Sequence, residues 1–312
     1  MNLTFDKAKR TQKSFSDLFF DSETISQAEK EERLRSFALA MHTEVSDMAS
    51  AVKLKDHHLN PEPADDSKIL YNLVDIARYV FASLNLWQID NKAFERAWEI
   101  KDAYLWEKHR LESLKYEGQP AVIIDIDDVL AHFREDFFAW LDKKYNFYLD
   151  AEGGSYFHGG TLLDGKTTIE DVYREFRETN GGLMSVRCND NIVNSLRVLE
   201  KSGVWIHILT ARPSSDLHCY YETFAWLLKN KIPYHSIDFN PEKFRAASTM
   251  HFYLQNKLLY AVDDSPKNAR EYSSQGIPVF VPKRGYNLGM ENEPGLKYFD
   301  WHTFQLPLSF EQ

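Results

Sequence analysis

The segment Ala121–Phe133, AVIIDIDDVLAHF, carries the strongest structural signal in the chain. A run of small and β-branched apolar residues ends abruptly in Asp125, Asp127 and Asp128. Such a run is typical of a strand buried on both faces of a parallel sheet. Clustered carboxylates at the end of a buried strand cost several kcal/mol unless another group compensates their charge. At the carboxyl end of a parallel strand, the compensating group is usually a bound ligand. The alternative is a strand that simply enters an acidic turn.

Similar apolar runs follow downstream. Val204–Pro213 reads VWIHILTARP and predicts a strand that ends at the hydroxyl of Thr210. Lys257–Asn268 reads KLLYAVDDSPKN and predicts a strand that ends in Asp263 and Asp264. A strand at 277–282 and helices at 190–201, 215–230, 241–256 and 266–274 complete the pattern. Alternating strands and helices predict a parallel α/β sheet, with the reactive groups along one edge.

These motifs resemble those of the haloacid dehalogenase (HAD) superfamily of phosphohydrolases. The family's DxDx(T/V) motif matches 125–129, its strand-ending hydroxyl matches Thr210, and its acid pair matches 263–264. Its lysine, which precedes the acid pair, is matched best by Lys243. The competing candidates for this lysine are Lys257 and Arg245. The resemblance covers about residues 121–312 and implies a Rossmannoid parallel sheet.

The resemblance also implies a role for each motif residue. Asp125 is the nucleophile that forms an aspartyl-phosphate, and Asp127 is the general acid that later serves as the base for water. Thr210 and Lys243 hold the phosphoryl oxygens. These roles agree with the chemistry of phosphoryl transfer, which depends mainly on positioning and charge neutralisation. An acid two residues beyond the nucleophile favours ester hydrolysis over dehalogenation, because the leaving alkoxide needs a proton.

The same resemblance implies a bound Mg²⁺, with Mn²⁺ as the alternative cation. Its expected ligands are Asp125, the backbone carbonyl of Asp127, Asp263 and Asp264. A carboxylate can attack a phosphate dianion only if a cation screens their repulsion. Arg212, in the TARP sequence, is expected to contact the substrate, and Asp128 is expected to be only a turn residue.

Residues 131–203 separate the first two motifs and are too long for a simple connection. Helices are predicted at Phe133–Tyr148 and Ile169–Thr179, around glycine-rich turns at 153–160 and 181–182. In the family an insertion here is a helical cap that selects the leaving group, and this one resembles that of 5′-nucleotidases. Core packing is the preferred role of its aromatic residues. The candidates for the alternative role, stacking on a base, are Phe133, Phe137, Phe138, Tyr156, Phe157 and His158.

The first 120 residues predict an all-α domain, because no glycine occurs before Gly118. Phe37–Val52, FALAMHTEVSDMASAV, has the apolar spacing of an amphipathic helix, and Ile69–Leu86, ILYNLVDIARYVFASLNL, is a more apolar helix. Each carries a polar pair three residues apart on one face, and two such helices can form a divalent-metal cage. The pairs are Glu44 with Asp47 and Asn72 with Asp75. The alternative is that Glu44 and Asp47 are solvated and Asp75 pairs with Arg78.

The two pairs resemble the ExxE and ExxD signature of the MazG and dimeric dUTPase superfamily of nucleotide pyrophosphohydrolases. This resemblance covers about 1–115 and implies that Glu44, Asp47, Asn72 and Asp75 are metal ligands. It also implies a basic helix at 92–112, with Lys101, Lys108 and Arg110 as substrate-binding residues. Asp47 and Asn72 stand where glutamate is usual, so a weakened or inactive site is the alternative. Single-domain relatives build the site between subunits, so a homodimer or homotetramer is expected.

The composition suits a two-domain enzyme. Of 312 residues, 43% are hydrophobic and 14% aromatic, which is typical of globular domains. No apolar run could span a membrane, and the N-terminus lacks an apolar signal core. Cys188 and Cys219 give no disulfide framework, so a cytoplasmic location is expected. The net charge of −10 argues against broad nucleic-acid binding.

The domain boundary is predicted at 113–120, SLKYEGQP, which divides an all-α domain at 1–115 from the α/β domain at 116–312. A polar loop is predicted at 56–68, where His57 and His58 are expected to be solvated.

The leading hypothesis is a Mg²⁺-dependent bifunctional nucleotide hydrolase. The helical domain would convert a (d)NTP to (d)NMP and pyrophosphate, and the second domain would convert the (d)NMP to nucleoside and phosphate. Such a chain would suit pool sanitation or a virus that remodels its host's nucleotides. The alternative is a HAD phosphatase for nucleic-acid ends or another small phosphomonoester, with a degenerate helical domain for oligomerisation or nucleotide sensing. The third hypothesis is a non-enzymatic nucleotide sensor.

Overall fold

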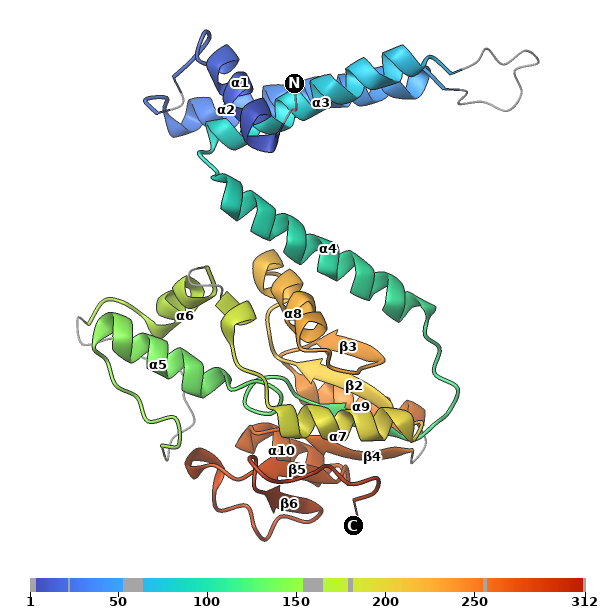
Figure 1. Ribbon diagram of the computed structural model, residues 1–312. Helices are drawn as coiled ribbons and strands as arrows, with labels where there is room; N and C mark the ends of the chain where they lie inside the picture. Colours follow the sequence, from blue (N-terminus) through green and yellow to red (C-terminus); the bar gives the residue numbers. More distant parts are fainter. Residues whose placement is uncertain are drawn as a thin grey trace. The chain divides into compact units, whose positions relative to one another are not determined.

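The computed structural model describes residues 4–21, 23–52, 64–153, 165–178, 182–254 and 257–310. The chain forms two compact units, Met1–Trp98 and Glu99–Gln312 (Figure 1). Most of the predicted loop at 56–68, with His57 and His58, lies outside the described residues, as do Tyr156, Phe157, His158 and most of the two predicted glycine-rich turns.

The first unit is helical. It comprises α1 (Phe5–Ser16), α2 (Gln27–Ser50), α3 (Asp66–Leu86) and the start of α4 (Asn91–Ser113). The longer helices begin at sequence-encoded caps: the side chain of Ser26 accepts a hydrogen bond from the amide of Glu29, and that of Asp65 accepts one from Lys68. α2 and α3 pack along each other, and α1 packs on α3 (Figure 1). The two helices predicted from apolar spacing are therefore confirmed within α2 and α3.

The second unit is built on a parallel sheet of six strands in the order β3-β2-β1-β4-β5-β6. The strands are β1 (Ala121–Ile124), β2 (Trp205–Thr210), β3 (Ser236–Phe239), β4 (Leu258–Val262), β5 (Val279–Pro282) and β6 (Leu296–Phe299). The chain runs outward from β1 to β3 and then returns to β4 on the other side of β1. The direction of winding therefore reverses between β1 and β4, which is where open α/β sheets bind ligands.

Helices cover both faces of this sheet. They are α7 (Asp190–Lys201), α8 (Leu217–Lys229), α9 (Lys243–Leu254) and α10 (Pro266–Ser274). Successive strand residues point to opposite faces, so Ile124 joins an apolar core with residues of α7 and α8, whereas Ile123 joins one with residues of α9 and α10. The predicted combination of an all-α part and a parallel α/β part is confirmed. None of the described helices is both long and apolar enough to cross a lipid bilayer.

An insertion separates β1 from α7 and contains α5 (Phe133–Tyr145), α6 (Ile169–Glu178) and the short 3₁₀ helix η1 (Gly182–Ser185). Its two ends lie side by side, because Ala131 and Cys188 form an antiparallel bridge and the amide of His132 donates to the carbonyl of Arg187 at 2.9 Å. The insertion is thus shorter than the predicted cap at 131–203. The difference is α7, whose apolar face packs on β2 and completes the sheet's covering layer.

The division between the two units falls inside α4, earlier than the boundary predicted at 113–120. The second half of α4 belongs to the sheet unit because its side chains bind there. The ring of Tyr104 lies 4.8 Å from that of Tyr221. The hydroxyl of Tyr234 donates to Oε2 of Glu107 at 2.7 Å. The glycine and proline at 118–120 therefore mark a turn into β1 rather than the boundary between the units.

Candidate functional site

Three buried carboxylates meet where the winding of the sheet reverses. Asp125 directly follows β1, and Asp263 and Asp264 directly follow β4. One oxygen of each lies within 4.8 Å of the others. Within the described ranges, no other set of three or more histidine, cysteine, aspartate or glutamate side chains has this spacing. The two acidic strand ends identified in the sequence are therefore brought together at one edge of the sheet.

A buried lysine joins this cluster. Lys243 begins α9, and its side chain is only 3% exposed. Its Nζ atom lies 2.6 Å from Oδ2 of Asp125 and 3.0 Å from Oδ2 of Asp263. Burial opposes the positive charge, but the two carboxylates outweigh burial and raise the pKa of Lys243. The other two candidate cations have other partners, since Lys257 donates to the carbonyl of Gly118 and Arg245 pairs with Glu242.

The cluster carries excess negative charge. Burial raises the pKa of Asp125 well above its usual value, and the neighbouring carboxylates of Asp263 and Asp264 raise it further, against the opposing effect of Lys243. Burial also raises the pKa of Asp264, with Asp128 and Asp263 adding to the effect. One ammonium faces three carboxylates. Because all the donors are carboxylate oxygens, the set suits a hard divalent cation such as Mg²⁺ or Mn²⁺ rather than a metal that prefers nitrogen or sulfur.

The side chain of Asp127 points toward Arg212. Oδ1 of Asp127 accepts from Nη2 of Arg212 at 2.6 Å, and Oδ2 accepts from Nε at 3.0 Å. The Asp127 side chain remains 28% exposed, whereas that of Arg212 is 1% exposed. The contact of Arg212 with substrate stays a prediction, while in this structure its guanidinium is buried and occupied by protein groups.

Thr210 ends β2 and is fully buried. Its Oγ1 accepts a hydrogen bond from the amide of Arg212 at 3.2 Å. Ile208 pairs with Ile124 across the sheet, so Thr210 lies two residues beyond β1's last paired residue, at the same edge as Asp125. The predicted phosphate-holding hydroxyl is thus at the right edge of the sheet for that role.

Asp128 is a turn residue, as expected, but it is also buried. Its backbone is left-handed, with φ of 57°, a conformation that aspartate tolerates better than most residues. Its Oδ1 accepts from the amide of Arg134 at 2.9 Å and so ties the acidic loop to the first turn of α5. Burial, with the nearby carboxylate of Asp127, raises the pKa of Asp128 to about 7. In the sequence, only the run of neighbouring aspartates indicated this contact between Asp128 and Arg134.

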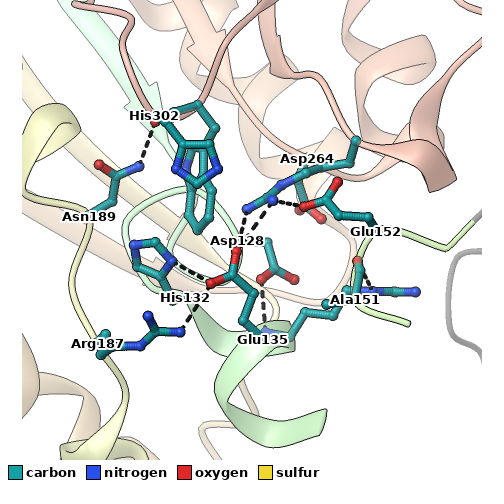
Figure 2. A network of polar contacts seen from close by, with 12 residues as sticks. Asp128, His132, Glu135, Ala151, Glu152, Arg187, Asn189, Asp264 and His302 are labelled. Carbon is teal, nitrogen blue, oxygen red and sulfur yellow. Dashed lines mark hydrogen bonds and ion pairs between the residues drawn. The ribbon is translucent and has the colours of Figure 1, made fainter. Parts of the chain in front are cut away.

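A second set of contacts connects the acid cluster to the insertion. The hydroxyl of Tyr286 donates to Oδ2 of Asp264 at 2.8 Å. The guanidinium of Arg134 lies 4.4 Å from the centre of the Tyr286 ring. Its Nε donates to the carbonyl of Ala151 at 2.9 Å (Figure 2). A metal ligand candidate on the sheet is thereby connected, through an aromatic ring and an arginine, to residue 151 of the insertion.

Arg284 anchors the insertion beside these contacts. Its side chain is 4% exposed and lies between Glu135 at the start of α5 and Glu152 (Figure 2). Its guanidinium also lies 3.8 Å from the centre of the Trp301 ring, and Nε1 of Trp301 donates to the carbonyl of Val129 at 2.9 Å. Sequence reasoning missed Tyr286, Arg284 and Trp301, because their partners are far away in the chain.

The aromatic residues of the insertion pack mainly on one another. Phe137 and Phe138 are buried in the apolar core, which confirms their preferred role. The half-buried Phe133 stacks on Phe137, with ring centres 5.7 Å apart, and meets Tyr173 of α6 edge-on at 5.4 Å.

The predicted metal cage of the helical unit is not assembled within the described residues of one chain. Glu44 and Asp75 are half-buried and Asp47 is exposed, and these three carboxylates do not form a closely spaced group. Asn72 is also half-buried, and its Nδ2 has no hydrogen-bond partner in the described part of the chain. Arg78 donates to Oε1 of Gln12 at 3.1 Å, so it has a partner other than Asp75.

The three basic residues expected to serve the helical site belong to the second unit. Nζ of Lys101 lies 3.8 Å from the centre of the Tyr221 ring. Arg110 pairs with Glu107 at 2.7 Å and donates to the carbonyl of Tyr234 at 2.8 Å, and Lys108 pairs with Glu112 at 3.7 Å. Lys101 and Arg110 thus contact groups of the second unit, and the expected role of the three residues toward a nucleotide in the helical unit stays a prediction.

Comparison with known proteins gives distant structural likenesses. No family model matches the chain, and no curated protein does. A haloacid dehalogenase-like hydrolase from Streptococcus pneumoniae is similar with a TM-score of 0.42 and 15% identity, over 60% of this chain and 96% of that one. A predicted phosphoglycolate phosphatase from Haemophilus somnus gives 0.41 and 13%, over 60% and 97%. The D,D-heptose 1.7-bisphosphate phosphatase from B. bronchiseptica, complexed with magnesium and phosphate, gives 0.35 and 12%, over 58% and 93%. Likenesses this distant carry no argument about function, which rests on the geometry of the site.

Proposed function

We propose that the second unit is a Mg²⁺-dependent phosphomonoesterase that acts through an aspartyl-phosphate on Asp125. The observation that supports this is the carboxylate cluster at the reversal of the sheet, with Lys243 bound to Asp125 and Asp263. A buried carboxylate beside a cation site can act as a nucleophile toward a phosphate ester. The nearby Asp127, which is partly exposed, supplies a second carboxyl group for proton transfer.

In the first step, an oxygen of Asp125 forms a bond to phosphorus while the bond from phosphorus to the ester oxygen breaks. The electron pair goes to the leaving oxygen, and the carboxyl of Asp127 gives that oxygen its proton. In the second step, water attacks the phosphorus and Asp127 takes the proton from water. The bond between phosphorus and Asp125 then breaks, which releases inorganic phosphate and restores both carboxyl groups.

The other residues supply charge and position. Asp125, Asp263 and Asp264 would hold the cation, which screens the repulsion between Asp125 and the phosphate. The ammonium of Lys243 and the hydroxyl of Thr210 would bind phosphoryl oxygens as negative charge redistributes in the transition state.

Phosphate release from p-nitrophenyl phosphate and from each deoxynucleoside 5′-monophosphate tests the proposal. Asp125→Asn should lower kcat by about 10³-fold or more, because the nucleophile is removed. Asp190→Asn is the matched control, since Asp190 is an exposed aspartate at the start of α7. Unchanged activity in Asp125→Asn, or no turnover of any phosphomonoester by the wild-type chain, would contradict the proposal.

We also propose that the physiological substrate is a nucleoside 5′-monophosphate. The insertion supports this, because it carries a group of aromatic side chains and its first helix begins soon after the acidic loop. In this proposal the exposed part of the Phe133 ring contacts the base, since Phe133 is only half-buried and follows the acidic loop by five residues. Comparable turnover of aliphatic phosphates and nucleotides would favour another small phosphomonoester instead.

For the helical unit, we propose a nucleoside triphosphate pyrophosphohydrolase site completed between two or more copies of the chain. Several large apolar side chains of α2 and α3 are exposed, among them Leu39 at 70% and Tyr71 at 68%. Exposure of several large apolar side chains on two neighbouring helices favours a covering partner. A homodimer or homotetramer would bury these side chains and bring Glu44 and Asp75 next to ligands from another copy.

Product analysis with a dNTP as substrate separates the two activities. Asp125→Asn should accumulate monophosphate and pyrophosphate, whereas Glu44→Gln should leave the triphosphate intact. Glu29→Gln, at an exposed position near the start of the same helix, is the matched control. If no dNTP yields pyrophosphate while light scattering shows an oligomer, the helical unit serves only for assembly or nucleotide sensing.

A further inference from the structure

The environment of Arg212 sets it apart from the other cations near the site. Its guanidinium makes a two-point contact with the carboxylate of Asp127 through Nε and Nη2. Its third nitrogen, Nη1, donates to Oγ1 of Thr223 on α8 at 3.2 Å. The ring of Trp226 lies 5.8 Å from the guanidinium carbon. Every side of this arginine is therefore occupied by groups of the sheet unit.

The backbone of Arg212 is fixed as well. Its amide donates to Oγ1 of Thr210, and the following residue is Pro213, which disfavours helical backbone at Arg212. Thr223 is itself held in place, because its hydroxyl donates to the carbonyl of Cys219 at 2.7 Å. A side-on, two-point arginine–carboxylate pair restrains the carboxylate plane as well as its position. The arrangement fixes the direction in which Asp127 presents its oxygens.

We propose that Arg212 is a positioning residue that holds the carboxyl group of Asp127 against the leaving oxygen of the substrate. This inference rests on the proposed phosphomonoesterase function. Arg212 is almost completely buried, so it does not touch the substrate, and it acts through Asp127. Asp127 is the partly exposed partner, so a leaving oxygen can come within the hydrogen-bond reach that proton transfer requires.

The role predicts a dependence on the leaving group. Proton transfer matters most when the leaving alkoxide is strongly basic and least when it is a stabilised phenolate. kcat/KM reports the step in which the ester bond breaks, so a misplaced Asp127 should lower it selectively for poor leaving groups. A purely structural role for Arg212 would instead lower kcat/KM by the same factor for all substrates.

The test measures kcat/KM for a series of aryl phosphates and one alkyl phosphate in full-length wild type, Asp127→Asn, Arg212→Met and Arg212→Lys. Asp127→Asn should lose roughly 10²–10⁴-fold on the alkyl ester. Arg212→Met should lose about tenfold or more on the alkyl ester and less than about threefold on p-nitrophenyl phosphate. Arg212→Lys should fall between Arg212→Met and wild type, because lysine restores one of the two contacts to Asp127.

Two further variants distinguish a loss of positioning from a general loss of folding. Thr223→Val removes the partner of Nη1 and should show a smaller loss with the same leaving-group dependence. Arg187→Met is the matched control, because Arg187 also makes a two-point contact with an aspartate, Asp136, but lies at the exposed base of the insertion. It should keep the wild-type dependence on the leaving group.

The double variant Asp127→Asn/Arg212→Met decides whether Arg212 acts through Asp127. It should lose no more than Asp127→Asn alone on the alkyl ester. A uniform loss across leaving groups in Arg212→Met, or fully additive losses in the double variant, would overturn the inference while leaving the phosphatase proposal standing. Absence of phosphatase activity in the wild type, or its persistence in Asp125→Asn, would overturn the proposed function and this inference with it.

Discussion

The Nζ atom of Lys243 lies 2.6 Å from Oδ2 of Asp125. The lysine and the aspartate come from distant parts of the chain, since Asp125 follows β1 and Lys243 begins the helix after β3. Only the folded sheet unit brings them together. The pair places the candidate nucleophile next to a fixed positive charge, and the same charge also binds Asp263 at 3.0 Å.

Replacement of Lys243 tests whether it is the lysine of the site, rather than Lys257 or Arg245. Lys243→Met keeps the length of the side chain but leaves the buried carboxylates without their cation. We expect kcat to fall by roughly 10²–10³-fold, as for other groups that stabilise transition-state charge. Arg245→Met and Lys257→Met should retain kcat within a factor of about two, because both side chains bind elsewhere. Steady-state hydrolysis of p-nitrophenyl phosphate measures all three. A larger loss in Lys257→Met than in Lys243→Met would contradict the assignment.

Removal of divalent cations should lower both activity and stability. Chelation with EDTA should abolish phosphate release, and Mg²⁺ at about one hundred times its Kd should stabilise the folded chain by about 2.7 kcal/mol. The physical reason is that the cation neutralises the excess charge of Asp125, Asp263 and Asp264. Differential scanning calorimetry with and without Mg²⁺ measures the shift. Asp263→Asn should remove most of it, whereas Asp190→Asn should keep it. An equal Mg²⁺-dependent shift in both variants would place the cation elsewhere.

His207 should make the sheet unit acid-sensitive. Its Nδ1 lies 2.8 Å from Oγ of Ser236, and burial lowers its pKa to about 4. The folded chain therefore keeps the imidazole neutral at pH values where the unfolded chain protonates it. The stabilisation is fully present above about pH 6.5 and is lost as the pH falls toward 4, by up to roughly 3 kcal/mol.

Hydrogen exchange of the amides of Trp205–Thr210 between pH 7 and pH 4, corrected for intrinsic rates, measures this dependence locally. His207→Gln should flatten it, because the group that titrates is removed. His302→Gln, at an exposed histidine of the same unit, should leave the dependence unchanged. The same pH dependence in wild type and His207→Gln would show that another group is responsible.

The sequence predicted the strands that carry the site but not those at the edges of the sheet. β1, β2 and β4 are largely buried on both faces, so each appears as a mainly apolar run, which only His207 interrupts before the polar end of β2. β3 reads SIDF and β6 reads LKYF, and both are short, with a charged residue, as is common for edge strands. Neither has the apolar pattern of a buried strand.

The motif positions of the site were also predictable, whereas the contacts among them were not. Asp125, Thr210, Asp263 and Lys243 stand at strand ends or a helix start, and their spacing along the chain indicated a shared edge. Asp127, the partner of Arg212, lies 85 residues away in the chain. No local sequence pattern predicts such a pair. A charged residue after a strand is equally compatible with binding substrate or binding protein. Only the burial and geometry of the folded chain separate these two roles.

Arg284 should control how firmly the insertion is held on the sheet unit. Its guanidinium binds Glu135 and Glu152 and lies against Trp301, so Arg284→Met removes both ion pairs while keeping most of the apolar contact. We expect a loss of about 1–3 kcal/mol in the local stability of the insertion, as is typical for hydrogen bonds to charged groups.

Limited proteolysis measures this loss. Cleavage near 151–153 should become faster in Arg284→Met, whereas the stabilisation by Mg²⁺ should persist, because Tyr286 still binds Asp264. Lys283→Met, at the exposed neighbouring position, is the matched control and should show wild-type cleavage. Faster cleavage in Lys283→Met, or loss of the Mg²⁺ effect in Arg284→Met, would show that the insertion is held in another way. Retention of the Mg²⁺ effect matters most, since it separates the anchoring of the insertion from the integrity of the acid cluster.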